Sequence, residues 1–151
     1  MSFINSTAAS ATMHCLTGCA IGEITGLVVG EILGLGAFLT IALAIMLAFI
    51  FGYSLSLIPV VKAGIALTTA LGVVLAADTL SIAVMELVDN TVVAVIPGAL
   101  NAGLVNPIFW LSLSLGLFIA FFAAYPVNKY LLERGKGHAL LHKYHHGGHD
   151  K

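Results

Sequence analysis

Charged residues are scarce in this sequence, which has 151 residues, of which only 9% are charged and 60% are hydrophobic. A soluble globular domain carries about 25% charged residues, so a chain this apolar cannot cover a water-facing surface. The mean hydropathy of +1.06 points the same way. The composition excludes a soluble protein and predicts an integral protein of the cell (inner) membrane, whose length suits one compact bundle within the lipid bilayer.

Basic residues and cysteines are also few, and the low number of each excludes one class of protein. The net charge is −1 and the six Lys and Arg form no basic patch, so nucleic acid is not expected as a partner. The two cysteines, Cys15 and Cys19, lie within one apolar segment. A small scaffold held together by disulfides is therefore not expected either.

Four apolar stretches, separated by Gly and Pro, predict an all-α fold built as a four-helix transmembrane bundle. We place the spans at about 13–35, 37–58, 78–97 and 107–130. The predicted organisation is a flexible N-terminal lead-in over 1–12, a four-helix transmembrane domain over 13–130 and a His-rich cytoplasmic tail over 131–151.

Residues 60–76 lie between the second and third spans and are themselves apolar. Joined to the third span, they would form one helix too long for an untilted crossing. We therefore expect a separate interfacial helix here, with Lys62, Thr68 and Thr69 towards water. Asp78 is then expected to cap the start of the third span.

The basic residues also predict the orientation of the chain. All of them lie in the loop between the second and third spans, in the last turn of the fourth span or in the tail, at Lys62, Lys129, Arg134, Lys136, Lys143 and Lys151. Loops rich in Lys and Arg stay on the cytoplasmic side of a membrane. Both termini of this multi-pass chain are therefore expected in the cytoplasm.

Residues 14–36 carry the most unusual pattern in the chain. At four-residue intervals one face of the predicted helix presents Cys15, Cys19, Glu23, Leu27 and Glu31. The neighbouring face presents a stripe of glycines, at Gly18, Gly22, Gly26, Gly30 and Gly34. Glycines at this spacing let another helix backbone approach closely. That helix could be the second or fourth of this chain or one from a second copy.

Acidic residues inside the spans require a reason. A carboxylate at mid-membrane costs about 2.5–3.5 kcal/mol on insertion scales. Glu23, Glu86 and Asp89 lie at comparable depths on the first and third spans, and no basic residue lies at that depth. They must be protonated, share protons, reach a water-filled cavity or bind a cation. The structural alternative is hydrogen bonding to Thr, Ser or Asn that only holds the helices together.

Cys15 and Cys19 form an i, i+4 pair beside His14. Thiolates suit soft ions such as Cu(I) or Zn(II), and imidazole suits both, so the three side chains predict a soft site near the cytoplasmic end. Membrane cysteines are also often inert packing residues. No oxyanion device or companion base accompanies the thiols, so enzymatic activity stays open and is not favoured.

The tail is rich in histidine. Four of its imidazoles share one side of a helix if the tail is helical: His138, His142, His145 and His146. Such a cluster can bind Zn, Cu or Ni weakly. The alternative is a solvated tail that titrates near neutral pH.

Four motifs give the chain a family resemblance. They are HCLTGCAIGE from His14, AADTLSIAVMELVDN from Ala76, YPVN from Tyr125 and GKGH from Gly135. With them the chain, over about residues 13–146, resembles a family of small microbial membrane proteins known as domain of unknown function 4396. The resemblance implies a four-helix membrane bundle and no established activity.

These observations predict a small membrane protein that binds or transports a soft transition-metal cation, with a copper or zinc ion as the expected metal. The predicted metal ligands are His14, Cys15, Cys19, Glu23, Glu86 and Asp89. The predicted accessory residues are Glu31, Asp78, Asn90, His138, His142, His145 and His146. The alternative is a structural or accessory subunit that packs through the glycine stripe against a membrane-protein partner or a second copy. A redox enzyme that cycles the Cys pair would need a quinone or haem site, and no haem-ligating His pair lies within the spans.

Overall fold

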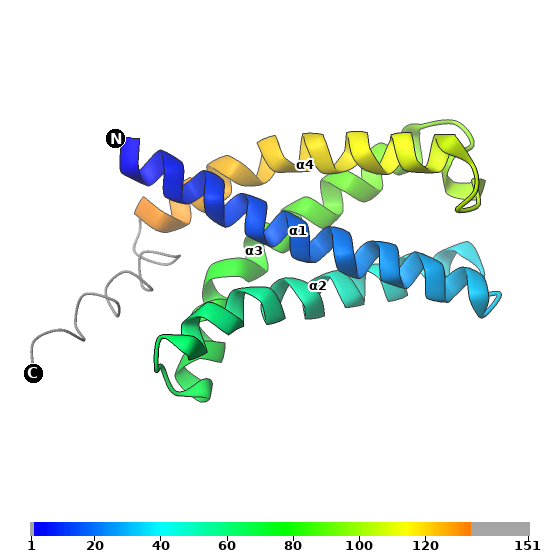
Figure 1. The fold of residues 1–151 in the computed structure, drawn as a ribbon. Helices are drawn as coiled ribbons and strands as arrows, with labels where there is room; N and C mark the ends of the chain where they lie inside the picture. Colours follow the sequence, from blue (N-terminus) through cyan, green and yellow to red (C-terminus); the bar gives the residue numbers. More distant parts are fainter. Residues whose placement is uncertain (1, 134–151) are drawn as a thin grey trace, which may run out of the picture.

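The computed structural model describes residues 2–133, and every regular element in that range is helical (Figure 1). The elements are α1 (Ser2–Ile32), α2 (Ala37–Lys62), α3 (Leu67–Val95), the short 3-10 helix η1 (Ala99–Asn101) and α4 (Pro107–Glu133). Within the described residues, four helices are long and apolar enough to cross a membrane. The prediction of an all-α four-helix bundle is confirmed.

The first helix starts earlier than the sequence indicated. Residues 2–12, expected to be a flexible lead-in, form the first turns of α1. Ala8 and Thr12 are fully buried, and Asn128 of α4 donates a hydrogen bond of 2.9 Å to the Thr12 hydroxyl. The small side chains of this segment let α4 pack closely against it. Residues that show no helical pattern in the sequence are therefore part of the bundle.

The predicted interfacial helix is absent from the described residues, and this expectation was wrong. α2 continues through Pro59 to Lys62, and α3 begins at Leu67 and runs without a break to Val95. Ala70 and Val74 pack against Val60 in a small buried cluster, so the apolar side of this segment is covered by α2. A long apolar helix is accommodated by tilting, and Figure 1 shows α3 running obliquely across the bundle.

Asp78 consequently has a different place from the one predicted. It does not cap the start of a helix but lies well inside α3, where only 3% of its surface is exposed. The ends of α2 and α3 are instead joined by a short turn that contains Gly64, which has a positive φ of 87°. Glycine adopts this backbone conformation without steric cost.

The glycine stripe of α1 packs against α2. A Cβ added to Gly18 would lie 2.7 Å from the Gly52 Cα, and one added to Gly22 would collide with the α2 backbone at Leu47 and Ala48. Gly26 faces Ala44 and Gly30 faces Thr40 in the same way. Gly34 differs, because a Cβ there would meet nothing and its φ is 65°. It belongs to the turn that follows α1.

Small residues also fill the centre of the bundle. One buried cluster contains Cys15, Cys19, Ala48, Ile82, Met85, Ala120 and Ala124, which come from all four long helices. Large apolar side chains such as Phe38, Leu87 and Phe118 point outward and are more than half exposed. This inside-out distribution is the one expected of a bundle surrounded by lipid tails.

The closeness of α1 and α2 leads to a stability prediction. We expect Gly22→Ala to destabilise the protein by about 1–3 kcal/mol, the usual cost of overpacking, because the new methyl group meets main-chain atoms that cannot move aside. Thermal unfolding of the detergent-solubilised protein measures the loss.

Gly72→Ala is the matched control for this change. Gly72 lies inside α3, and a Cβ there meets nothing within 4 Å. The same substitution should therefore be neutral or stabilising by up to about 1 kcal/mol, the helix-propensity difference between Gly and Ala. Equal losses at the two positions would show that the glycine stripe does not hold the helices together.

Candidate functional site: a buried polar column between α1 and α3

Three side chains of α1 meet three acidic side chains of α3 inside the bundle. Cys15 lies within hydrogen-bonding reach of Asp78, Cys19 of Glu86, and Glu23 of Asp89. We call these six residues the polar column. None of their side chains is more than 5% exposed. The acids Glu23, Glu86 and Asp89 are therefore brought together, as their predicted depths in the membrane suggested.

The pairing follows from the helical repeat and from the direction of the helices. Residues four apart share one face of a helix, so α1 presents Cys15, Cys19 and Glu23 in one line. α1 and α3 are the first and third helices of an up-and-down bundle and run in the same direction (Figure 1). The order along α1 is therefore matched by the same order along α3, from Asp78 to Asp89.

Two serines join the column at its inner end, which is the end near Cys15. Ser56 of α2 and Ser81 of α3 both face the Cys15 thiol, and they are 2% and 0% exposed. Both hydroxyls lie within hydrogen-bonding reach of this thiol, and neither has another hydrogen-bond partner. Sequence reasoning missed both residues. Ser81 follows Asp78 by three positions and so shares its helix face, which was a usable signal, whereas nothing in the sequence pointed to Ser56.

The middle of the column contains two carboxyl groups that are held differently. The Asn90 side-chain amide donates to the Glu86 backbone oxygen over 2.8 Å and to the Glu86 carboxyl over 3.4 Å. Asp89 has no such donor for either carboxyl oxygen. It lies against Gly116 of α4, where a Cβ would collide with its carboxyl group. Glu23 and Asp89 can bond to each other only through a proton held between them, because carboxylates are acceptors alone.

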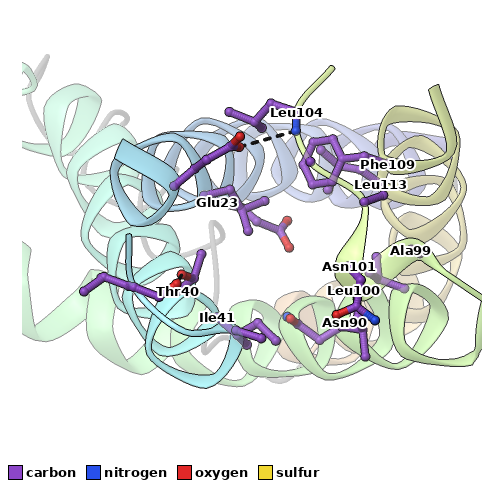
Figure 2. Close-up of a pocket in the computed structure, with 17 residues that line it drawn as sticks. Glu23, Thr40, Ile41, Asn90, Ala99, Leu100, Asn101, Leu104, Phe109 and Leu113 are labelled. Carbon is purple, nitrogen blue, oxygen red and sulfur yellow. Dashed lines mark hydrogen bonds between the residues drawn. The ribbon is translucent and has the colours of Figure 1, made fainter. Parts of the chain in front are cut away.

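The outer end of the column opens into a cavity of about 380 Å³. Figure 2 shows Glu23 extending into this space, with Thr40 and Asn90 at its sides. The segment between α3 and α4, which includes η1, lines one side of the cavity. Glu23 thus belongs to both the column and the cavity, since it pairs with Asp89 and also forms part of the cavity wall.

Glu31 lies on the wall of the same cavity, nearer the turn between α1 and α2. Its carboxyl accepts a hydrogen bond of 3.4 Å from the Leu104 N–H, and the Trp110 indole donates over 2.7 Å to the Leu104 carbonyl oxygen. These two bonds tie the loop before α4 to the end of α1 and to α4 itself. The Glu31 carboxyl therefore lies beside the loop that borders the cavity.

His14 lies apart from the column. Its side chain is exposed, and Nε2 is 2.9 Å from the Leu55 carbonyl oxygen of α2. His14 precedes Cys15 by one residue. In a helix of 3.6 residues per turn its side chain therefore points about 100° away from that of Cys15. The predicted soft site of His14, Cys15 and Cys19 is therefore not assembled. Each thiol faces a carboxyl group of α3, and both cysteines are free.

Over residues 2–133, no three His, Cys, Asp or Glu side chains converge in an arrangement that could hold a metal ion. The column is a succession of pairs, and each pair has one side chain from α1 and one from α3. α1 and α3 contain no Lys or Arg to neutralise these groups. The predicted tail ligands His138, His142, His145 and His146 lie outside the described residues.

The contact between Asp89 and Gly116 can be tested by a double-mutant cycle. We expect Gly116→Ala to cost about 1–3 kcal/mol of unfolding free energy, because the methyl group takes the place of the Asp89 carboxyl. In an Asp89→Ala background that space is free, so the same change should cost less, with a coupling of about 0.5–3 kcal/mol between the two sites. Additive losses in detergent unfolding would contradict the contact.

Comparison with known proteins identifies the family and nothing closer. The family model described as domain of unknown function (DUF4396) matches residues 5–137, which include α1 from residue 5 onward, all of α2, α3 and α4, and the whole polar column. Neither the curated proteins nor the solved structures contain a match. By this match over most of its length, the chain belongs to the family of domain of unknown function 4396.

Proposed function

We propose that this protein binds a transition-metal cation, copper or zinc, and carries it across the membrane along the polar column. The observation that carries the proposal is the double position of Glu23. Its carboxyl lines the cavity at one end of the bundle and pairs with Asp89 inside the bundle. A cation that enters the cavity therefore meets the first group of a buried series of acids and thiols.

The proposed route follows the order of the side chains. With both termini in the cytoplasm, as the basic residues favour, the cavity faces the outer side. The ion would be attracted by Glu31 at the cavity wall and pass to Glu23 and Asp89. It would then pass Glu86 with Cys19 and leave beyond Cys15 with Asp78. The tail histidines would serve as a weak local metal buffer.

The chemistry of the column favours a transition metal as cargo. Acids buried in a membrane are costly and typically mark ion or proton pathways. Here two of the three pairs add a thiol to the carboxyl, and sulfur donors select transition metals over Mg²⁺ or Ca²⁺. Pairs with few ligands also suit passage, because conduction requires binding that is weak enough to release the ion to the next site.

The alternative of an accessory subunit rested on the glycine stripe as a docking face. Gly18, Gly22, Gly26 and Gly30 all pack against α2 of the same chain. The face that was to receive a partner is therefore covered within the described part of this chain. No second function is proposed here, because no observation now favours it.

Transport by proteoliposomes tests the proposal. We expect Glu23→Gln to lower the uptake of Zn²⁺ or Cu⁺ by roughly tenfold or more, since even a residue that only orients a metal ligand typically contributes that much to metal affinity. The reason is that Glu23 is the group that joins the cavity to the column. Cys15→Ser combined with Cys19→Ser should also lower uptake while leaving the protein folded.

Glu133→Gln is the matched control for the transport assay. Glu133 is exposed at the end of α4, so the same isosteric change should leave uptake unaltered. Thermal unfolding of each variant separates a transport defect from a folding defect. Wild-type vesicles that accumulate neither ion, or a Glu23→Gln variant that transports as well as Glu133→Gln, would refute the proposal.

A further inference from the structure

The cavity at the outer end of the bundle has a carboxyl group at each of two levels of α1. Glu23 and Glu31 both line it, and Leu27 lies between them on the same face of the helix. Two full four-residue steps separate the two acids, which is about 12 Å along the helix axis. We infer that this cavity binds a linear organic diammonium ion, with one ammonium group at each carboxyl and the hydrocarbon chain along Leu27.

The inner carboxyl group has no donor from the chain. Glu23 is only 4% exposed, and its side chain extends into the cavity (Figure 2). Its partner Asp89 is another acid, and among the described residues no donor reaches one oxygen of Glu23 or either oxygen of Asp89. Acids buried in this way are costly unless a cation or a donor accompanies them. An ammonium group supplies both, because it carries a positive charge and three N–H donors.

Asn90 supplies a further acceptor beside Glu23. Its side-chain NH₂ group donates to the Glu86 backbone oxygen and to the Glu86 carboxyl, over 2.8 Å and 3.4 Å. The amide oxygen of Asn90 therefore remains as an acceptor. Figure 2 shows Asn90 on the cavity wall near Glu23. An ammonium group at the inner end of the cavity can thus donate to two different side chains.

The outer carboxyl group is suited to the second ammonium. Glu31 is exposed, and its carboxyl accepts a hydrogen bond from the Leu104 N–H over 3.4 Å, which is longer than the usual range of about 2.7–3.2 Å. This weak bond leaves the Glu31 carboxylate able to accept from a ligand. The outer ammonium would stay near water, so only the inner one must lose its hydration.

The walls between the two acids favour an organic ion. Ile41, Val93, Phe109 and Leu113 line the cavity together with Leu27. Sites for small molecules are mostly apolar, with a few polar groups and volumes of about 300–1,000 Å³, and the volume of about 380 Å³ lies in this range. A hydrocarbon chain gains from such walls, whereas a hydrated inorganic ion does not.

The charge of the cavity excludes anionic ligands. None of the described residues that line it is Lys, Arg or His. An anion would therefore meet two carboxyl groups without a positive charge to balance them. A dication matches both acids at once.

This inference goes beyond the proposed function, because binding in the cavity requires no passage along the polar column. The two share one residue, since Glu23 belongs to both the cavity and the column. A bound diammonium ion would occupy the entrance to the column and should block the uptake of a metal ion.

Isothermal titration calorimetry of the full chain in detergent tests the inference with three ligands of equal length. Octanediamine, aminooctanol and octanediol carry two, one and no ammonium groups, and their affinities should fall in that order. Butanediamine also carries two ammonium groups, but its chain is too short to reach both carboxyls. It should bind more weakly than octanediamine.

Variants of the two acids separate the ends of the cavity. Glu23→Gln should weaken octanediamine binding by about tenfold or more, the usual effect of losing a buried hydrogen bond to a charged group. Glu31→Gln should weaken it by about twofold to fivefold, the range for an exposed ion pair, and should leave octanediamine close to aminooctanol in affinity. Glu133→Gln is the matched control, because Glu133 is exposed and does not line the cavity. If Glu23→Gln fails to fold, the comparison of Glu31→Gln with Glu133→Gln still decides, since both positions are exposed.

Three results would overturn the inference: octanediol that binds as tightly as octanediamine, butanediamine that binds at least as tightly, or equal octanediamine affinities in Glu31→Gln and Glu133→Gln. Its failure can be told from failure of the proposed function. If octanediamine does not bind while Zn²⁺ or Cu⁺ uptake depends on Glu23, the diammonium site alone is refuted. If octanediamine binds as expected while vesicles transport neither ion, transport alone is refuted.

Discussion

The close packing of α1 on α2 is the constraint on which the rest of the structure depends. Only the face of α1 that carries Gly18, Gly22 and Gly26 can approach α2 this closely. A side chain at any of these positions would meet the α2 backbone or a methyl group attached to it. With the glycine face fixed against α2, the neighbouring face, which carries the two thiols and Glu23, must turn towards α3 and the interior. The position of the polar column therefore follows from the packing of the α1 glycines against α2.

The column is costly, and this cost bears on its role. Each carboxyl at mid-membrane costs about 2.5–3.5 kcal/mol on insertion scales, and an apolar pair of similar size would pack without that cost. Asn90 offsets part of it at Glu86, but the partner of Asp89 is another acid, Glu23, so neither carboxyl oxygen of Asp89 has a donor unless the two acids share a proton. Asp89 rests in the space left by Gly116. A pair that served only to hold two helices together would be expected to satisfy its hydrogen bonds. The unsatisfied groups favour function over stability as the reason for the column.

Most of the fold could be predicted from the sequence, whereas the details of the site could not. Apolar length predicts four spans, and the four-residue spacing predicts both faces of α1, because these depend on the helical repeat alone. The start of α1 at Ser2 and the continuous α3 depend on tertiary contacts, such as Asn128 with Thr12 and Val60 with Val74, which no local pattern reveals. The contact of His14 with Leu55 and the position of Ser56 beside Cys15 depend on how α2 is rotated about its axis. That rotation is set by the glycine contacts and is not encoded in α2 by any periodic signal.

The two ends of the column differ, and the difference limits how an ion could move through it. At the outer end Glu23 reaches a cavity, but at the inner end Cys15 is enclosed by Ile82, Ala120 and Ala124. Passage therefore requires a rearrangement at the inner end. In the α1–α2 contact the helices are already so close that a Cβ at Gly18, Gly22 or Gly26 would collide with α2. α3 and α4 meet the column through side chains that can change rotamer, including Ile82 and Met85. If an ion passes along the column as proposed, the inner end would open by movement of α3 and α4 relative to the α1–α2 pair.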